Sequence, residues 1–431
     1  MYEASANFHY SFQAQTNQVS KILDKIKLPD TPSVFTLELT SACNHHCEGC
    51  GNVFSHDEEY LKYDDWKEII NKIKKHAFSL RVTGGECTLH PEFDLIIKEI
   101  EKLKVPYVIF TNGDWMSPDE MLNLFKSCQH CDGLLISLHG YDAESYYSFV
   151  KTEAFDRIVA NIEKSVKAGL KVALNTVLNK YNYQKIEKIV KLGKSLGVFS
   201  IAFSRYCGQN LNEFELSKQE FLTVFHQIIQ FNKHDKSIVF NNCVPACFDS
   251  EGYPTKACTS GIIHCTIGPD GFVRPCTHSP LKLGKINEKS IEEIWRSDGL
   301  KYWHSLIPEN CLNCALFNQC RGGCRATAYH KNLQQDPFIN FSNIKKTKDV
   351  ETQTLKINSN ARLSVNYRIK TQDFGYFLIN RNRHIPVKKE AAPILSYLNK
   401  SPQIKDIEDK YGKQALNFVG TLIVAGLVLI E

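Results

Sequence analysis

Three cysteines near the start of the chain have the spacing of an iron-binding loop. Cys43, Cys47 and Cys50 follow directly after the apolar, β-rich run of residues 35–40. Three thiolates from one short loop can bind three irons of a [4Fe-4S] cubane, which leaves the fourth iron without a protein ligand and open to a small molecule. A zinc site or chance spacing is the alternative. The spacing therefore favours a reactive cluster if the neighbouring sequence can hold a ligand.

A second and longer set of cysteines lies downstream. It is spaced as Cys258-x12-Gly271-x4-Cys276, followed by Cys311-x2-Cys314-x5-Cys320-x3-Cys324. In a cytosolic chain with sixteen cysteines, closely spaced groups bind metal more often than they form disulfides. Two pairs of this kind can also form a zinc ribbon. Cys243 and Cys247 are spare thiols close enough to be recruited, with a structural role equally open, while burial is expected for Cys128 and Cys131.

The segments that must position these cysteines alternate between β-rich runs and amphipathic stretches of helical period. Between residues 33 and 204 we expect six strands, beginning near Phe35, Leu80, Tyr107, Leu134, Val172 and Ser200. Repeated βα units predict a parallel sheet, and six units fit a partial (β/α)6 barrel of the α/β class. We expect four parts: an extension over residues 1–30, the barrel over 31–235, a cysteine-rich domain over 236–345 that metal staples together, and a terminal unit over 346–431 that begins with a linker at 345–353.

Polar residues stand where the predicted strands end. These are Gly84, Gly85 and Glu86 after the second strand, Asn112 after the third, Ser137 and His139 at the fourth, Asn175 at the fifth, and Ser204 with Arg205 at the sixth. Each is weak alone, since Gly-Gly-Glu can be a plain βα turn. Barrels of this kind bind ligands at the carboxyl ends of their strands, so together they predict a binding site there.

The cysteine loop followed by Gly-Gly-Glu resembles the radical S-adenosylmethionine (SAM) superfamily. The resemblance implies that the open iron chelates the methionine end of SAM and that electron transfer produces a 5'-deoxyadenosyl radical, which abstracts hydrogen from substrate. It implies SAM contacts from Gly84, Gly85, Glu86, Asn112, Ser137, His139, Asn175 and Arg205. Cys87 replaces the proline that often follows Gly-Gly-Glu. It is a possible catalytic residue near the radical, although a small buried thiol is the commoner fate of such a cysteine.

The downstream cysteines resemble the SPASM domain, an auxiliary-cluster extension of peptide-modifying radical enzymes. By analogy, the first auxiliary [4Fe-4S] cluster would be held by Cys258, Cys265, Cys276 and Cys324, and the second by Cys311, Cys314 and Cys320. With the first loop this makes three clusters. The family usually supplies one more cysteine, but none follows Cys324. The second auxiliary cluster could take His330, Asp336 or another non-cysteine ligand, bind substrate at an open iron, or be absent.

The last eighty residues have the order strands, then three helical segments, then a short strand. They resemble the PqqD-like recognition element, a small winged-helix module that binds the leader of a ribosomally made peptide as an added β-strand. We expect the strand at residues 374–380 or its neighbour to be the edge that receives the leader. A DNA-binding winged helix is the alternative, which Asp406, Glu408 and Asp409 among the lysines do not favour.

Composition excludes several classes of function. A net charge of +5 over 431 residues gives no support for nucleic-acid binding. The start of the chain lacks a secretory signal, so we expect a cytoplasmic protein. Residues 415–430 are the one apolar run to consider as a membrane span, and it is too short and contains Gly420 and Gly426. No membrane association is expected.

These interpretations combine into one hypothesis. The chain is predicted to be a radical SAM maturase that binds a precursor peptide through its leader and receives electrons from a flavodoxin or ferredoxin. The product would be a crosslink, an epimerised residue or a peptide with backbone excised. The alternatives are a sulfatase-maturing type of oxidation of Cys or Ser on a protein, and a noncatalytic peptide-binding iron-sulfur scaffold.

Overall fold

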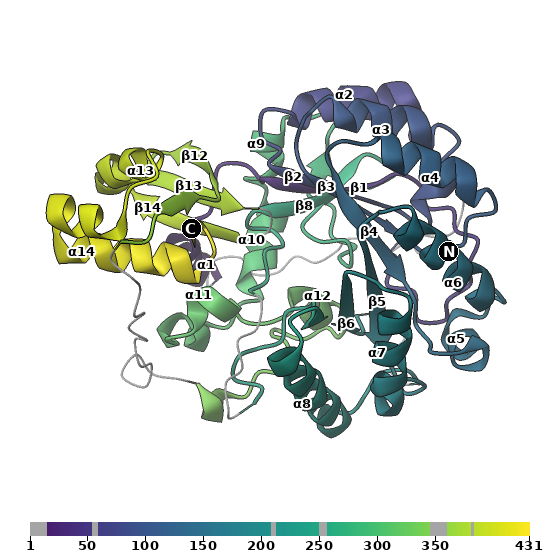
Figure 1. Cartoon of the computed structure of the whole chain (residues 1–431). Coiled ribbons are helices and arrows are strands. Elements are labelled where there is room, and N and C mark those ends of the chain that lie inside the picture. The colour runs from purple at the N-terminus through teal and green to yellow at the C-terminus, as the bar shows by residue number, and fades with distance from the viewer. Residues whose placement is uncertain (1–14, 54–58, 208–212, 250–256, 345–359, 381–382) are drawn as a thin grey trace.

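A sheet of ten strands forms the centre of the computed structural model, which describes residues 15–53, 59–207, 213–249, 257–344, 360–380 and 383–431 (Figure 1). Its strand order is β10-β9-β8-β1-β2-β3-β4-β5-β6-β7. The six predicted parallel strands are β1 (Val34–Glu38), β2 (Ser79–Thr83), β3 (Tyr107–Thr111), β4 (Cys131–Ser137), β5 (Val172–Leu178) and β6 (Ser200–Arg205). The partial barrel with a parallel sheet is therefore confirmed.

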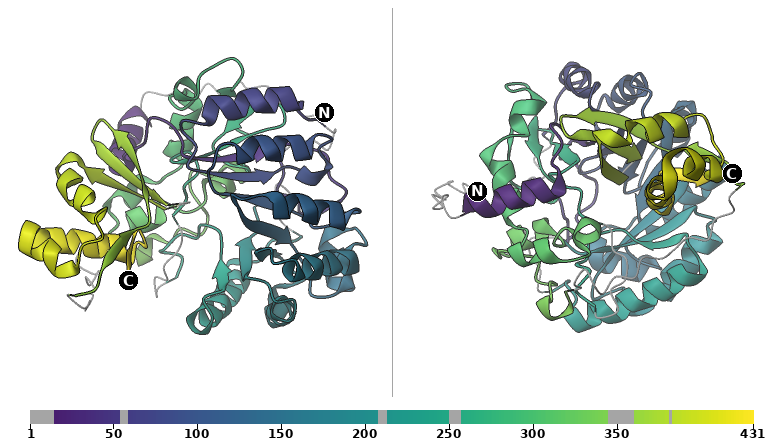
Figure 2. Two further views of the ribbon diagram at one scale, coloured as in Figure 1. Left: turned by 45° about the horizontal axis from the view of Figure 1, so that its top comes forward. Right: turned by 90° about the vertical axis from the view of Figure 1, so that its left-hand side faces the viewer.

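Helices cover the outer face of the barrel (Figures 1 and 2). They are α2 (Tyr63–Ile73), α3 (Phe93–Glu101), α4 (Pro118–Ser127), α5 (Ala143–Val150), α6 (Phe155–Lys167), α7 (Ile186–Ser195) and α8 (Lys218–His234). Each turns an apolar stripe to the sheet, as α6 does with the fully buried Ile158 and Ile162. Ser217 starts α8 by a reciprocal cap with Glu220. The helical period that predicted α6 thus matches the face that packs.

The cysteine-rich region extends the barrel sheet instead of forming a separate body. Strand β8 (His264–Ile267) pairs in parallel with β1, and β9 (Phe272–Arg274) and β10 (Gly284–Lys285) follow it antiparallel. At the other edge, β7 (Ile238–Phe240) pairs with β6. The region also contains α9 (Ile291–Ile294), α10 (Asp298–Ser305), α11 (Phe317–Cys320) and α12 (Arg325–His330). Both edges of the six-stranded sheet are therefore continued by flanking segments.

The N-terminal helix α1 (Gln15–Ile26) packs against the cysteine-rich region (Figure 2, right). The Gln18 side chain donates to the carbonyl of Ile307 at 3.1 Å, and Ile22 and Ile26 are buried in a cluster with Cys247 and Cys311. The segment predicted as an extension therefore covers part of the second cysteine set.

The C-terminal unit lies at one end of the molecule, away from α4, α5 and α6 (Figure 1). It contains a sheet of β12 (Arg368–Gln372), β13 (Gly375–Asn380) and β14 (Arg383–Lys388), the pair β11 (Leu363–Val365) and β15 (Val428–Ile430), and the helices α13 (Ala392–Leu398) and α14 (Ile404–Val424). Gly412 interrupts α14 with a φ of 79°, so three helical segments precede the last strand. The predicted order is confirmed; the predicted linker at 345–353 lies outside the described residues.

Within the part of the chain that the structure describes, no helix combines the length and the apolar character needed to cross a membrane.

Candidate functional site

The loop after β1 brings Cys43, Cys47 and Cys50 together. The amide of His45 donates to the sulfur of Cys43 and the amide of Asn52 to that of Cys50, each at 3.4 Å. Burial raises the pKa of Cys43 to about 11, and the charges of Glu86 and Cys50 add to the rise. Burial also raises the pKa of Cys47 and Cys50. Thiols in such a site become thiolates when a metal binds them, and the two amides then point at the developing charge.

Gly84 and Gly85 pack directly against the cysteine loop. The amide of Gly85 donates to the carbonyl of Thr40, and that of Glu86 to the carbonyl of Ala42, each at 2.7 Å. A Cβ on Gly85 would stand 2.3 Å from the carbonyl oxygen of Ala42, and one on Gly84 would stand 2.6 Å from that of Thr40. The two glycines therefore allow β2 to fix the start of the loop. Their contact with SAM stays a prediction.

The buried carboxylate of Glu86 joins the ends of β2 and β3. It accepts from the amide of Asn112 at 2.6 Å, from the hydroxyl of Thr111 at 2.8 Å and from that of Thr88 at 2.7 Å. Asn112 in turn donates to the side chain of Asn44 in the cysteine loop at 2.7 Å. Glu86 and Asn112 thus lie beside the loop, as predicted, and their direct role toward SAM stays a prediction.

Asp114, which sequence reasoning missed, anchors the cysteine loop to the barrel. Its carboxylate accepts from His45 at 3.2 Å, from Asn44 at 3.2 Å and from Arg157 of α6 at 2.9 Å. Burial raises the pKa of Asp114, but the hydrogen bonds from Arg157 and His45 outweigh this effect and bring the pKa below its usual value. An aspartate two residues after Asn112, together with an arginine in the first turn of α6, is the sequence signal for this anchor.

The ends of β4, β5 and β6 form one polar surface. Ser137 is paired with Asn175 on the next strand, and the hydroxyl of Ser204 donates to the amide oxygen of Asn175 at 2.6 Å. His139 accepts from the amide of Val177 through Nδ1 at 3.2 Å, and burial lowers its pKa to about 4. The ring is therefore neutral with its proton on Nε2, which can donate to a ligand. The structure brings these predicted residues together.

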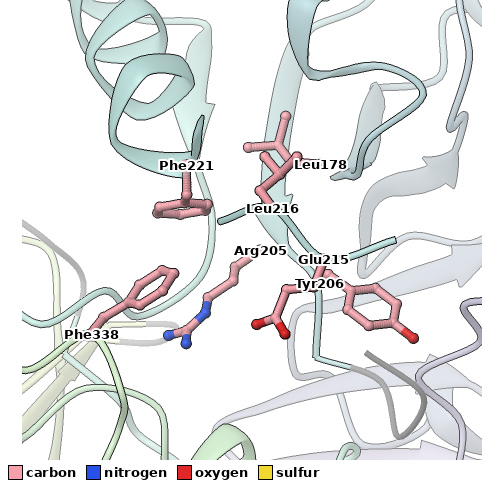
Figure 3. Close-up of a pocket in the computed structure, with 7 residues that line it drawn as sticks. All are labelled: Leu178, Arg205, Tyr206, Glu215, Leu216, Phe221 and Phe338. Carbon is pink, nitrogen blue, oxygen red and sulfur yellow. The ribbon is translucent and has the colours of Figure 1, made fainter. Parts of the chain in front are cut away.

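Arg205 departs from its predicted place. Its guanidinium pairs with Asp336 at 2.9 Å and stacks on Phe338, with 3.8 Å from the guanidinium carbon to the ring centre. Figure 3 shows it beside Phe338 and Phe221, which line the same small pocket. Because the Arg205 guanidinium pairs with Asp336, and the Asp336 carboxylate also accepts from the amides of Cys324 and Phe338, the geometry favours neither the SAM contact of Arg205 nor the use of Asp336 as a metal ligand.

Five cysteines form the first downstream group. They are Cys207, Cys243, Cys258, Cys276 and Cys324. Cys324 has side-chain contacts with Cys207 and Cys243, Cys243 also contacts Cys258, and Cys276 senses the charges of Cys258 and Cys324. The hydrogen bond from Cys243 and the charge of Arg325 lower the pKa of Cys258 to about 6. Three of the four predicted ligands are therefore in one place.

The assignment of Cys265 to this group is corrected by the structure. Cys265 lies in β8 opposite Phe35 of β1, fully buried in the hydrophobic core, and only burial acts on its pKa. Because β8 pairs with β1, the side chain of Cys265 lies in the core. Cys243, which the sequence left as a spare thiol, takes a place in the group, and Cys207 joins it from the end of β6.

The second downstream group consists of Cys247, Cys311, Cys314 and Cys320. These thiols line a small pocket together with the apolar side chains of Phe317, Ile339 and Ile344. The amide of Ala246 donates to the sulfur of Cys320 at 3.3 Å. Cys247 thus fills the place that the sequence left without a ligand. His330 instead donates from Nε2 to the carbonyl of His278 at 2.5 Å.

The remaining cysteines have structural surroundings. Cys87 is fully buried, with its sulfur 3.4 Å from the carbonyl oxygen of Phe110, so the structure favours the buried-thiol interpretation over a catalytic one. Cys128 and Cys131 lie at the start of β4 beside Tyr107.

Comparison with known proteins gives the family of each part. A family model for the radical SAM superfamily matches residues 37–193, and one for the SPASM iron-sulfur cluster-binding domain matches residues 258–325. The chain contains a radical SAM domain and a SPASM domain. The first and the second downstream groups each contain three cysteines of the SPASM segment. The loop with Cys43, Cys47 and Cys50 belongs to the radical SAM segment.

Similar proteins include enzymes that act on different substrates. An AdoMet-dependent heme synthase of Methanosarcina barkeri is 26% identical over 73% of this chain and 97% of its own length. The mycofactocin maturase MftC of Mycobacterium tuberculosis is 23% identical over 74% of this chain and 85% of its own. The crystal structure of Streptococcus suis SuiB bound to the precursor peptide SuiA superposes with a TM-score of 0.61 at 18% identity, covering 76% of this chain and 80% of SuiB. The likeness to SuiB shows a shared fold.

The SPASM segment contains buried cations that fit an anionic group. Arg325 is 1% exposed and donates to the sulfur of Cys258 at 3.3 Å, while its Nε has no partner. Arg321, also buried, has an unpartnered Nη1. A buried charge is costly unless it is compensated, and an iron-sulfur cluster with four thiolates carries negative charge. The residues of the first downstream group therefore fit such a cluster.

Proposed function

We propose that this chain is a radical SAM maturase that modifies a ribosomally made precursor peptide. One observation carries the proposal: a loop with three cysteines lies at the strand ends of the barrel, and two larger groups of thiols lie beyond it. That arrangement suits one reactive cluster and two electron-carrying clusters. We place the enzyme in the cytoplasm, with a flavodoxin or ferredoxin as electron donor.

Eleven cysteines would hold three [4Fe-4S] clusters. Cys43, Cys47 and Cys50 would hold the first. Four thiolates would hold each auxiliary cluster: Cys243, Cys258, Cys276 and Cys324 the one, and Cys247, Cys311, Cys314 and Cys320 the other, with Cys207 beside the former. When bound, the open cluster supplies an electron to SAM, whose cleavage gives a radical able to abstract hydrogen from a peptide.

The chain's own residues bind and orient the cofactor. Asp114 contacts His45 of the cysteine loop and Arg157 of α6. These two contacts hold the loop at the strand ends. The neutral His139 presents an N–H donor beside Ser137 and Asn175, a set suited to the hydroxyls and carboxylate of SAM. Together with the backbone of Gly84 and Gly85, these groups would fix the ligand at the carboxyl ends of the strands.

The C-terminal unit would capture the leader of the precursor. The sequence predicts that the leader adds to the strand at residues 374–380 or to its neighbour. That strand is β13, which lies in the centre of its sheet and is paired on both sides. Its neighbour β12 holds the unit to the barrel: Lys370 donates to the carbonyl of Thr31 at 2.7 Å, and Gln372 accepts from the amide of Asp30 at 3.0 Å. The outer edge of β14 is thus the proposed place for strand addition. We keep the four predicted parts as a proposal, with helix α1 placed on the SPASM side.

A radical-cleavage assay tests the proposal. The protein, reconstituted without oxygen, is incubated with SAM, dithionite and the precursor peptide encoded beside its gene. We expect 5'-deoxyadenosine and a mass change in the core peptide: loss of two hydrogens for a crosslink, none for epimerisation, a large loss for excision. Chain with Cys43, Cys47 and Cys50 replaced by alanine is the matched control.

The same assay separates the alternatives. Absence of 5'-deoxyadenosine from fully reconstituted protein would favour the noncatalytic scaffold. Radical cleavage with oxidation of a Cys or Ser on a protein, and no change in the precursor, would favour the sulfatase-maturing type. Fluorescence polarisation with a labelled leader peptide checks the C-terminal unit, and failure of every leader encoded nearby to bind would contradict its assignment.

A further inference from the structure

Arg325 is a buried cation whose partner is a cysteine and not a carboxylate. It begins α12, directly after Cys324, and α12 lies beside the end of β6 (Figure 1). Its Nη2 donates to the sulfur of Cys258 at 3.3 Å and also to the carbonyl of Ser260. Among the described residues, no Asp or Glu pairs with Arg325. Its guanidinium carbon also lies 5.5 Å from the ring centre of Trp303, so the sulfur of Cys258 is the contact that can carry a full negative charge, as a thiolate.

Two other buried arginines of the chain are built differently. Arg205 pairs with Asp336, and Arg274 pairs with Glu38. Each of these arginines therefore has a carboxyl group at hydrogen-bond distance, which Arg325 lacks among the described residues. Arg325 brings a whole positive charge to the first downstream group.

Arg321 strengthens this imbalance. It is 7% exposed, and its Nη2 donates to Nε2 of His384 at 3.0 Å. Burial lowers the pKa of His384, so this ring is neutral. Arg321 also interacts electrostatically with Cys258. Two guanidinium groups without carboxylate partners therefore face the same thiol.

In the part of the chain that the structure describes, no buried arginine or lysine acts on the thiols of the second downstream group. Its sulfurs are surrounded by apolar side chains, and the bond from the amide of Ala246 to Cys320 is neutral. The nearest charged group on α1 is the exposed Lys25, whose Nζ lies 5.3 Å from the ring centre of Phe317. An exposed charge is screened by water far more than a buried one.

We propose that Arg325 sets the first auxiliary cluster at a higher reduction potential than the second. The inference rests on the proposed clusters. One-electron reduction adds a negative charge to a cluster, and a fixed buried cation beside its thiolate stabilises that charge. Net charge and hydrogen bonds to sulfur are the terms through which a protein adjusts this potential. Arg325 supplies both the charge and a hydrogen bond at the sulfur of Cys258. It therefore acts through the cluster as a positioning residue and not on the substrate.

Redox titration of the auxiliary clusters tests the inference. In a background with Cys43, Cys47 and Cys50 replaced by alanine, the chain is expected to hold about eight irons, and electron paramagnetic resonance follows the reduction of both clusters. Arg325→Met should lower one of the two potentials, with the reduced-to-oxidised ratio at a fixed potential falling at least about tenfold, which is about 59 mV for a one-electron couple. Arg325→Lys should restore much of the loss. Lys25→Met is the matched control and should move neither potential by this amount.

Each outcome decides the question. If Arg325→Met loses about four irons and Arg325→Lys keeps them, the result would also support pairing between the charge of residue 325 and the cluster. The inference is overturned if Arg325→Met keeps about eight irons with both potentials unchanged, or if both variants lose the cluster alike, which would indicate packing. If the background itself holds fewer than about eight irons, the proposed set of clusters fails first, and the tuning role falls with it.

Discussion

Gly85→Ala is expected to remove the reactive cluster while leaving the auxiliary ones. The new Cβ would stand 2.3 Å from the carbonyl oxygen of Ala42 and 2.4 Å from that of Ser41. Both neighbours are backbone atoms, so ordinary contact requires the loop to move by roughly 1 Å. Overpacking of this kind costs about 1–3 kcal/mol, and here the displaced backbone is the one that carries Cys43. We expect iron to fall from about twelve to about eight per chain after reconstitution.

Iron analysis and the production of 5'-deoxyadenosine measure this effect. Gly420→Ala is the matched control, because no atom lies within 4 Å of its would-be Cβ and the residue stands inside helix α14. Alanine there should keep about twelve irons and stabilise the helix by up to about 1 kcal/mol. A Gly85→Ala protein that retains about twelve irons and normal SAM cleavage would refute the argument that Gly-Gly-Glu holds the loop.

Three further predictions concern single side chains. Asp336→Ala leaves Arg205 buried and unpaired and should lower the free energy of unfolding by about 3–5 kcal/mol in urea titrations, whereas the apolar pair Arg205→Met with Asp336→Leu should recover much of it. Cys247→Ser should remove about four irons and Cys265→Ser none; equal iron in the two variants would contradict the corrected ligand set. Because burial lowers the pKa of His139 to about 4, the folded state binds fewer protons there than the unfolded one, and stability is lost as pH falls from about 6.5 toward 4. The melting temperature of His139→Gln should therefore fall less over this range, and parallel curves would rule the effect out.

The barrel could be predicted because its signal is local. Each strand is a short apolar run before a polar end, and each helix repeats its apolar positions with the helical period. What the sequence could not give is pairing between distant segments. The hairpin of β8 and β9 lies some 225 residues after β1 in the chain and yet continues its sheet, and α1 packs on residues near Ile307.

The anchor at Asp114 shows the same limit on a smaller scale. His45, Asp114 and Arg157 are far apart in the chain, and none belongs to a motif of its own. The cysteine spacing predicts that a loop must hold three thiols. It does not predict which side chain outside the loop fixes it, because that depends on how β3 and α6 are placed against each other.

The two downstream groups show why cysteine spacing predicts a cluster more reliably than its ligands. Cys265 fits the linear pattern, but it lies in a strand, where the neighbouring β1 decides which surroundings each side chain meets. Cys243 and Cys247 fit no linear pattern, but they lie in an irregular segment free to fold over both groups. Three residues separate them, and each completes a different group. A single short loop thus joins the two proposed clusters, so a change in its backbone is expected to affect both, and the iron content of Pro245 variants would measure that coupling.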